Sequence, residues 1–341
     1  MTRAALAVAA LLLAACLVAT GGRATGVAKP RVGFVTYSGV VPTKRTLEGQ
    51  TFAGFLKAEK ELEISGRIVY VAPTQDPSGA LTTLAREKYD LVIVALPRID
   101  VVDVVARKFP HVRFFLIDVP PQRFRAPHEP PNVQGSVYRA EEAGYLAGYL
   151  GALMESRTPG VHAISAVGGI PYIGVNRWTV GYKAGARKAD PAIAVKLGYS
   201  QDFANPAKCR RVAQRQIAEG SGVVFNISGT CGLGTLRAAK DEAVWGVGVD
   251  IDQAFLGPHV LTSAVVKLDA GVVAVVRRFT RGELAFNRDP VFNLHNGGVG
   301  LGRISPKVPR PLLDRLERIR AAIVAGKIRV PRPTNRPPRP T

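Results

Sequence analysis

Short apolar segments alternate with amphipathic segments along most of the chain. The apolar segments are rich in Val, Ile, Leu and Phe, as is typical of strands buried in a parallel sheet. We predict strands over residues 31–36, 67–72, 91–95, 113–118, 132–138, 160–167, 192–199, 222–228, 245–250 and 260–266. We predict helices over residues 46–64, 78–88, 101–109, 140–155, 173–188, 207–219, 232–242, 270–281 and 311–325. This alternation indicates parallel βαβ units and therefore an α/β fold.

The order of these elements predicts two lobes, one built from the βαβ units before about residue 138 and the other from those after it. We expect residues 257–291 to return to the first lobe as a strand and a helix. The predicted domains are an export segment (1–28), lobe 1 (30–138 with 257–291), lobe 2 (139–256 with 292–325) and a basic, Pro-rich tail (326–341). Two lobes joined by several crossings form a hinged clamp around a cleft.

The N-terminus has the features of an export signal. Arg3 precedes an apolar run over residues 4–19, which is short for a membrane span. Within this run, Leu13-Ala14-Ala15-Cys16 matches a lipoprotein cleavage box. We therefore expect an exported protein that is anchored through Cys16 to the extracytoplasmic face of a membrane. Ordinary signal cleavage a few residues later is the alternative.

Export changes the interpretation of Cys209 and Cys231, because an oxidising compartment favours disulfides. Cys209 lies near the start of a predicted helix, and Cys231 follows a predicted strand of the neighbouring βαβ unit. We predict a disulfide between them, with two buried thiols as the alternative. The five histidines form no recognisable metal or triad pattern, so we expect neither a metal site nor a hydrolase.

The formal net charge of +20 is concentrated toward the C-terminus. A basic surface favours anionic partners, although better solubility is the plainer explanation. No aromatic residue accompanies the basic tail, so the stacking surface typical of single-strand binding is missing. We therefore expect no nucleic-acid partner.

One strand end carries candidate chemistry. The apolar strand over residues 245–250 ends at Asp250, and Lys267 follows the next apolar run. In parallel α/β sheets, ligands bind beyond the carboxyl ends of the strands. Asp250 is therefore a candidate acceptor for hydroxyl groups of a small molecule, and Lys267 is a candidate positive partner. An ordinary strand-end turn is the alternative.

Four segments, taken in order, resemble one known family. They are EEAGYLAG at 141–148, GGIPYIGVNRWTVGYKAGA at 168–186, GVDIDQ at 248–253 with the following Lys267, and NGGVGL at 296–301. They are similar to the basic membrane protein family of bacterial substrate-binding lipoproteins, which includes purine nucleoside receptors. The resemblance extends over about residues 31–325 and implies a type I periplasmic binding protein fold, with two Rossmann-like lobes, a hinge and an interlobe cleft.

The resemblance also implies a function and a site. The expected function is delivery of a nucleoside, most simply a purine nucleoside, to the permease and ATPase of an ABC importer, by a monomer without catalytic activity or cofactor. Asp250 would hold ribose hydroxyls, Lys267 would be a polar cleft residue and Trp178 would stack on the base. Gly229 would lie in a loop close to the ligand, and Asp118 is a candidate from the first lobe. Core packing of Trp178 and a solvated Lys267 are the alternatives.

The first loop departs from the family. Members carry acidic residues and a Ser-Phe-Asn segment soon after the first strand, whereas this chain has Lys44 and Arg45 there. Tyr37 is the candidate replacement for the aromatic residue. The identity of the ligand is therefore left open, and a different nucleoside, a modified nucleoside and a more anionic molecule are the alternatives.

Two other classes of function share features with this sequence. The segment GTCGLG at 229–234 follows a strand and precedes Asp250 as a dinucleotide-binding loop would. Its spacing is Gly-x-x-Gly-x-Gly rather than Gly-x-Gly-x-x-Gly, which argues against a dehydrogenase. A surface lipoprotein that senses the ligand and signals to a membrane partner would have the same cleft, so the sequence leaves that alternative open.

Overall fold

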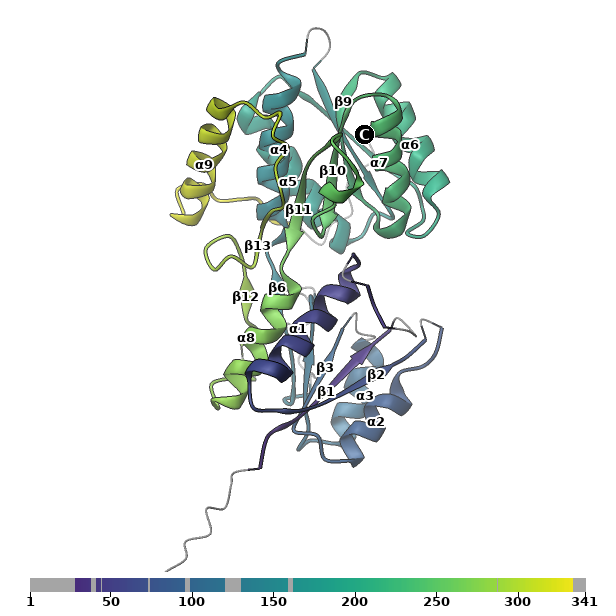
Figure 1. The fold of residues 1–341 in the computed structure, drawn as a ribbon, viewed down its shortest axis with the longest axis vertical. Coiled ribbons are helices and arrows are strands. Elements are labelled where there is room, and N and C mark those ends of the chain that lie inside the picture. Colours follow the sequence, from purple (N-terminus) through teal and green to yellow (C-terminus); the bar gives the residue numbers. More distant parts are fainter. Residues whose placement is uncertain are drawn as a thin grey trace, which may run out of the picture.

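Two lobes are stacked along the long axis of the molecule in the computed structural model (Figure 1). The structure describes residues 28–37, 41–43, 45–72, 74–95, 99–119, 130–158, 162–286 and 288–333. Cys16, the predicted export segment and the end of the basic tail lie outside the described residues. Within them, no helix combines the length and the apolar character that a membrane crossing requires.

Lobe 1 is built on a five-stranded parallel sheet with the order β2–β1–β3–β4–β5. Its strands are β1 (Arg31–Thr36), β2 (Ser65–Tyr70), β3 (Leu91–Val94), β4 (Arg113–Leu116) and β5 (Val133–Gly135). Its helices are α1 (Leu47–Glu61), α2 (Ser78–Arg86), α3 (Ile99–Lys108) and α8 (Leu268–Thr280). Alternate residues of each strand face opposite layers, so Phe34 packs with α1 and α8 while Val35 packs with α2 and α3.

Lobe 2 has a six-stranded sheet with the order β13–β11–β10–β9–β7–β8, in which only β13 is antiparallel to its neighbour. Its strands are β7 (Ala163–Gly168), β8 (Ala194–Tyr199), β9 (Ser221–Ile227), β10 (Trp245–Asp250), β11 (Val260–Val266) and β13 (Val299–Leu301). Its helices are α4 (Ala140–Glu155), α5 (Ile173–Ala189), α6 (Pro206–Ala218), α7 (Gly232–Asp241) and α9 (Arg310–Val324). The predicted α/β fold with two lobes is therefore confirmed.

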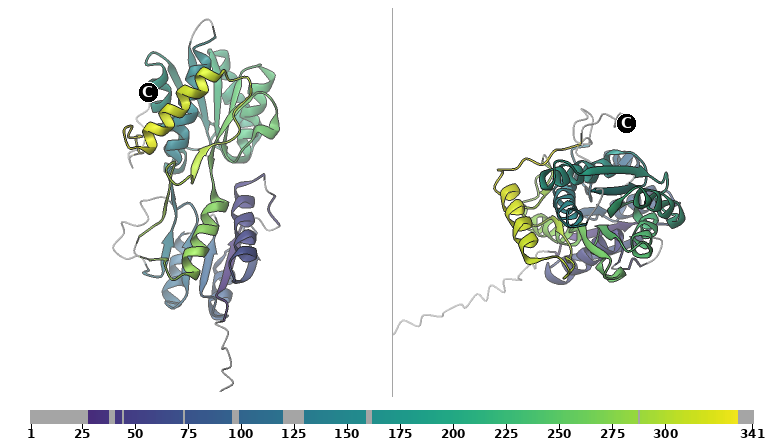
Figure 2. Two further views of the ribbon diagram at one scale, coloured as in Figure 1. Left: turned by 60° about the vertical axis from the view of Figure 1, so that its left-hand side comes forward. Right: turned by 90° about the horizontal axis from the view of Figure 1, so that it is seen from above.

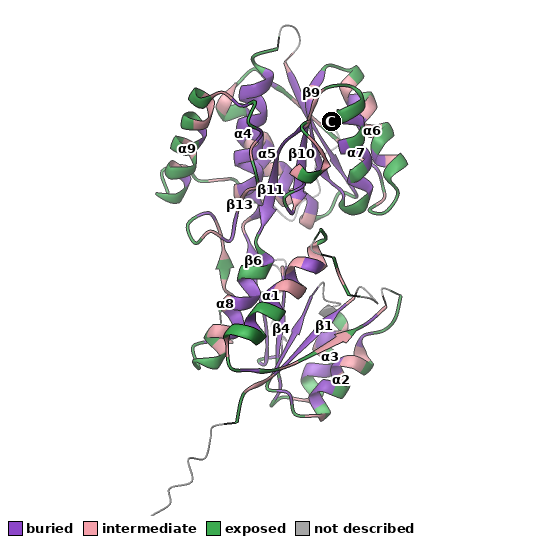
Figure 3. Ribbon diagram, in the orientation of Figure 1, coloured by how far each residue is buried: buried purple, intermediate pink, exposed green. Residues whose placement is uncertain are grey.

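Helix α4 is buried along almost its whole length, between α5, the sheet and the outer helix α9 (Figure 3). It meets α5 through glycines of both helices. A Cβ atom on Gly185 would lie 1.9 Å from the carbonyl oxygen of Tyr145, and one on Gly148 would lie 2.0 Å from that of Tyr182. The glycines in two of the family-like segments therefore allow a close backbone contact that fixes the position of α5.

Three segments run between the lobes (Figure 2). The first links β6 (Val137–Tyr138) to α4, the second links β11 to α8 at Lys267, and the third links β12 (Val291–Phe292) to β13. Strands β6 and β12 pair in parallel, and the rings of Tyr138 and Phe292 stack with centroids 4.7 Å apart. Several parallel connections restrict the lobes to hinge-like motion.

The strand over residues 260–266, which we expected in lobe 1, lies in the sheet of lobe 2. As β11 it pairs with β10 on one side and with β13 on the other, and all its residues are buried. The prediction of its lobe was wrong because a uniformly apolar strand fits the interior of either sheet equally well. The crossing to lobe 1 comes at Lys267 instead, and α8 then packs on α1 in lobe 1 as expected.

The predicted disulfide is present. Cys209 near the start of α6 is bonded to Cys231, which ends a short 3₁₀ helix, Gly229–Cys231, ahead of α7. Both residues are fully buried. The bond therefore connects α6 to the loop that follows β9 at the cleft.

Candidate ligand site between the lobes

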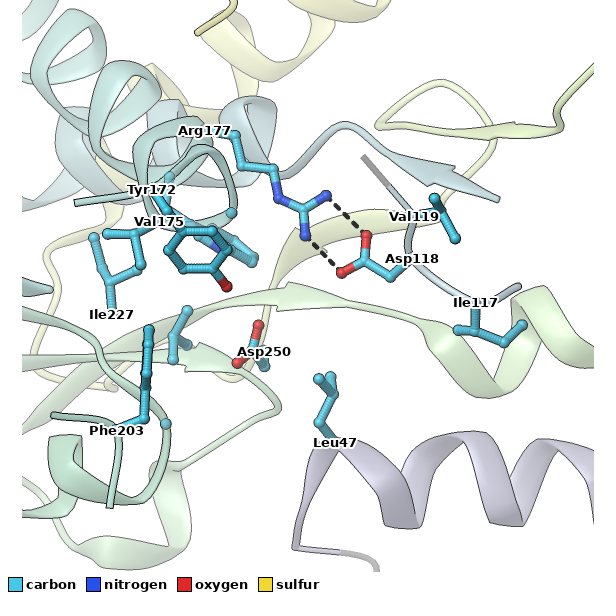
Figure 4. Close-up of a pocket in the computed structure, with 14 residues that line it drawn as sticks. Leu47, Ile117, Asp118, Val119, Tyr172, Val175, Arg177, Phe203, Ile227 and Asp250 are labelled. Atoms are coloured by element: carbon cyan, nitrogen blue, oxygen red, sulfur yellow. Dashed lines mark hydrogen bonds and ion pairs between the residues drawn. The ribbon is translucent and has the colours of Figure 1, made fainter. Parts of the chain in front are cut away.

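A pocket of about 380 Å³ lies between the two lobes. Lobe 1 supplies Leu47, Ile117, Asp118 and Val119, and lobe 2 supplies Tyr172, Gly174, Val175, Arg177, Trp178, Phe203, Ile227, Gly229, Val249 and Asp250 (Figure 4). Many of these residues follow the carboxyl ends of β4, β9 and β10, where α/β folds bind ligands. The volume and the mostly apolar lining suit a small organic molecule.

Asp118 and Asp250 enter this pocket from opposite lobes with the same unusual backbone. Both have positive φ angles, 55° for Asp118 and 64° for Asp250, a conformation that Asp adopts more readily than most residues. The Asp118 N–H donates to Ser136 Oγ at 3.1 Å, and the Val119 N–H donates to the Ser136 carbonyl at 2.9 Å. These bonds hold the turn after β4 that directs Asp118 to the cleft.

The turn that carries Asp250 is also held by buried polar groups. Gln253 Oε1 accepts from the N–H of Val249 at 3.0 Å, and the Gln253 N–H donates to Ser263 Oγ on β11 at 2.9 Å. Gln253 and Ser263 are both buried. The Asp250 side chain itself is therefore not needed to hold the turn and remains available to a ligand.

Arg177 of α5 connects the two lobes across this pocket. Its Nη1 and Nη2 donate to Oδ1 and Oδ2 of Asp118 at 2.8 and 2.6 Å, and Figure 4 shows this paired contact. Burial alone would lower the pKa of Arg177, but the Asp118 carboxylate raises it above its ordinary value. Sequence reasoning missed Arg177. Its signal is a charged residue within a helix face that otherwise carries Gly174, Trp178 and Gly181.

The environment of Asp250 disfavours its charged form. Burial raises the pKa of this carboxyl, the Asp118 carboxylate raises it further, and Arg177 opposes the rise, with a result of about 7. An Asp in an unfolded chain titrates at about 3.9. Asp250 is therefore a carboxyl group that changes charge near neutral pH, and this is common at functional sites.

This pKa gives a prediction for stability. The folded protein binds the Asp250 proton more tightly than the unfolded chain does, so protonation of this carboxyl stabilises the folded state. This contribution to the free energy of unfolding is fully present below about pH 4 and is lost as the pH rises through about 7. The free energy of unfolding of the native protein should thus fall with rising pH relative to that of an Asp250→Asn variant. Urea unfolding of both proteins at pH 5 and pH 8 measures the difference. Parallel pH dependences in the two proteins would show that Asp250 titrates normally.

The aromatic surface of the pocket comes from two residues that sequence reasoning missed. Tyr172 and Phe203 are 46% and 38% exposed, and their rings meet edge to face with centroids 5.9 Å apart. Trp178 also lines the pocket, but it is only 3% exposed and packs edge to face on Phe225. Most of the Trp178 ring is therefore packed in the core of lobe 2. Tyr172 and Phe203 offer the larger ring surface to a ligand.

Of the other predicted site residues, Gly229 lines the pocket, whereas Tyr37 and Lys267 lie outside its lining. Gly229 has a φ of 57°, a conformation that favours glycine. Tyr37 follows β1 and packs on the core beneath α2 and α3, while Lys267 is exposed at the start of α8 and donates its N–H to the Gly298 carbonyl at 2.9 Å. Ligand contacts by either side chain stay a prediction.

Comparisons with known proteins identify the family. A model of the family described as "ABC transporter substrate-binding protein PnrA-like" matches residues 49–334. Basic membrane protein A of Borreliella burgdorferi is 30% identical over 239 residues, 68% of each chain. The "ABC transporter nucleoside-binding protein BmpA" of Lactococcus lactis is 27% identical over 250 residues, again 68% of each.

Solved structures show the same fold at lower identity. A solute-binding protein of an Aeropyrum pernix ABC transporter has a TM-score of 0.72 and 17% identity, and covers 89% of this chain and 94% of its own. A transcriptional activator of the comK gene from Bacillus halodurans has a TM-score of 0.73 and 18% identity, and covers 87% and 99%. Together with the match over most of the chain, the two lobes and the pocket between them show that this protein belongs to the PnrA-like family of ABC transporter substrate-binding proteins.

Proposed function

We propose that this protein captures a nucleoside outside the cytoplasm and delivers it to the permease and ATPase of an ABC importer, with purine nucleosides as the first candidates. The observation that carries the proposal is that Asp250 shares one interlobe pocket with two exposed rings, those of Tyr172 and Phe203, which together form an aromatic corner. A nucleoside presents the matching groups, which are sugar hydroxyls and a flat base. Export and anchoring through Cys16 belong to the same proposal.

The carboxylate suits the sugar half of such a ligand. Two neighbouring hydroxyls can both donate to one carboxylate, and hydrogen bonds to an ionised acceptor are stronger than those between neutral groups. Asp250 lies at the end of β10 with its turn already fixed by Gln253 and Ser263. Little backbone entropy is therefore lost when a ribose docks there.

The aromatic corner suits the base. Stacking of a base on an aromatic ring contributes roughly 1–3 kcal/mol and tolerates different bases. Tyr172 and Phe203 lie on the lobe 2 side of the pocket, and Leu47, Ile117 and Val119 form an apolar wall on the lobe 1 side. A base held between these surfaces would bring both lobes into contact with the ligand.

A thermal-unfolding panel tests the proposal directly. The mature protein would be heated with nucleosides, free bases, ribose, amino acids and small anions. A ligand at about one hundred times its dissociation constant adds roughly 2.7 kcal/mol to the stability of the folded state. We expect a rise in melting temperature with nucleosides and a much smaller one with ribose or base alone. A rise with amino acids, sugars or anions and none with nucleosides would refute the assignment of the ligand.

The aromatic corner carries a separate prediction. Phe203→Ala should weaken nucleoside binding by roughly tenfold, because one of the two exposed ring faces is lost. Isothermal titration calorimetry measures the dissociation constant. Tyr70→Ala is the matched control, since Tyr70 is 37% exposed on β2 and lies outside the pocket lining. Equal affinities of the two variants would place the base elsewhere.

A further inference from the structure

The contact between Asp118 and Arg177 joins the lobes through charge. Asp118 belongs to the turn after β4 in lobe 1, and Arg177 belongs to α5 in lobe 2. Their side chains are only 15% and 12% exposed. Both carboxylate oxygens and both terminal guanidinium nitrogens take part, so the contact fixes orientation as well as distance.

Two weaker contacts accompany this pair at the same interface. Gln50 Nε2 on α1 donates to the Asp250 carbonyl at 3.3 Å, and the guanidinium of Arg45 lies 4.7 Å from the ring centre of Phe255. Arg45 belongs to the first loop, in which this chain departs from its family. Lobe 1 therefore contacts lobe 2 through polar and charged groups of the protein itself.

The chemistry of the pair suits a reversible contact. A buried ion pair gains little over a well-packed apolar contact, because both charges must be removed from water. When the lobes separate, both charges regain water, so the open form is not heavily penalised. A large apolar interface would instead hold the lobes permanently closed. The paired contact can thus define one relative orientation of the lobes and still release it.

We propose that Arg177 is a positioning residue for ligand binding, which clasps Asp118 and holds lobe 1 over the pocket in the geometry that encloses a ligand at Asp250. This inference rests on the proposed function for the nature of the ligand, but not for the closure itself. The ligand would then bind to lobes that are already oriented. Asp118, with both oxygens engaged by Arg177, acts here as the partner of that residue.

The test separates closure from binding. Spin labels on cysteines introduced by Lys57→Cys in α1 and Lys188→Cys in α5, both exposed positions, report the distance between the lobes. Distances would be measured without ligand, and nucleoside affinity by calorimetry, for Arg177→Gln, for Arg177→Lys and for the charge exchange Asp118→Arg with Arg177→Asp. Arg187→Gln is the control, because Arg187 is exposed in the last turn of the same helix. Far-ultraviolet circular dichroism confirms that each variant is folded.

We expect Arg177→Gln to lengthen the ligand-free distance and to weaken nucleoside binding on the order of 100-fold. Arg177→Lys, which keeps the charge without the paired contact, should lie between this variant and the native protein. The charge exchange should restore the short distance and bring the affinity to within about tenfold of the native value. The control should match the native protein in both measurements.

Two results would overturn the inference. The distance in Arg177→Gln could stay unchanged, or the charge exchange could restore neither closure nor affinity. An unchanged distance together with lost affinity would make Arg177 a direct ligand contact. If the native protein bound no nucleoside, the proposed ligand would fail, and the distances alone would still decide whether the pair holds the lobes together.

Discussion

Replacing Asp250 with alanine is expected to weaken nucleoside binding on the order of 100-fold, with little loss of folded structure. The substitution removes the carboxylate that would accept the sugar hydroxyls, and each hydrogen bond to a charged group contributes roughly 1.5–3 kcal/mol. The turn should survive because Gln253 and Ser263 hold it through its backbone. Removing a partly buried carboxylate whose pKa is raised also relieves a desolvation penalty at pH 8, which offsets the backbone cost of alanine at a φ of 64°.

The design of the measurement isolates the sugar contact. Calorimetry with a nucleoside and with its 2′-deoxy and 3′-deoxy analogues forms a double-mutant cycle. The native protein should discriminate against at least one analogue, and Asp250→Ala should bind all three with similar weak affinity. Asp252→Asn is the control, since Asp252 is exposed two residues away and outside the pocket lining. Native affinity in Asp250→Ala would exclude this carboxylate from the site.

Breaking the bond between Cys209 and Cys231 is expected to lower the free energy of unfolding by about 3 kcal/mol. The two cysteines are 22 residues apart, and closing a loop of that size reduces the entropy of the unfolded chain by about this amount. The paired substitution Cys209→Ser with Cys231→Ser avoids a stray thiol. Urea unfolding measures the free energy, and the native protein with and without a reductant provides the internal comparison. An unchanged transition under reduction would show that the bond adds nothing to stability.

The disulfide variant should still bind the same ligand. Neither cysteine lines the pocket, although Gly229, which does, begins the 3₁₀ helix that ends at Cys231. A modest loss of affinity with unchanged preference among nucleosides would reflect looser positioning of that turn. A change of preference would instead show that the bond shapes the site directly.

The sequence pattern was sufficient to predict most helices and strands, and to predict the two strand-end carboxylates as pocket residues. Strands β1, β10 and β11 and helix α4 have the predicted bounds, because long apolar or amphipathic runs end sharply at polar residues. Asp118 and Asp250 meet in one pocket because each ends or follows a strand of a different lobe, and the carboxyl edges of both sheets face the cleft. The lobe that receives β11 was not predictable, since its uniform apolar pattern carries no information about its neighbours.

The sequence did not reveal the direction in which each side chain points, and this limited the prediction of the site. Trp178 and Arg177 are adjacent on α5, and the sequence favours the tryptophan as the ligand contact on the basis of resemblance. In the fold Trp178 turns toward Phe225, while Arg177 reaches Asp118 in the other lobe. Phe203 becomes a pocket residue only because the loop after β8 is brought beside Tyr172. Such contacts depend on the packing of separate elements, which spacing along one helix does not reveal.

The late position of α8 in the chain has a consequence for biosynthesis. Helix α8 covers α1 so closely that a Cβ atom on Gly54 would lie 2.5 Å from the Asp269 carbonyl oxygen, yet it is synthesised after most of lobe 2. A chain that emerges from the ribosome N-terminus first therefore carries an unfinished lobe 1, without the helix that packs on α1, until about residue 280 is made. Neither lobe can fold to completion before the other is nearly made, so chaperones have a long interval in which to hold the chain unfolded.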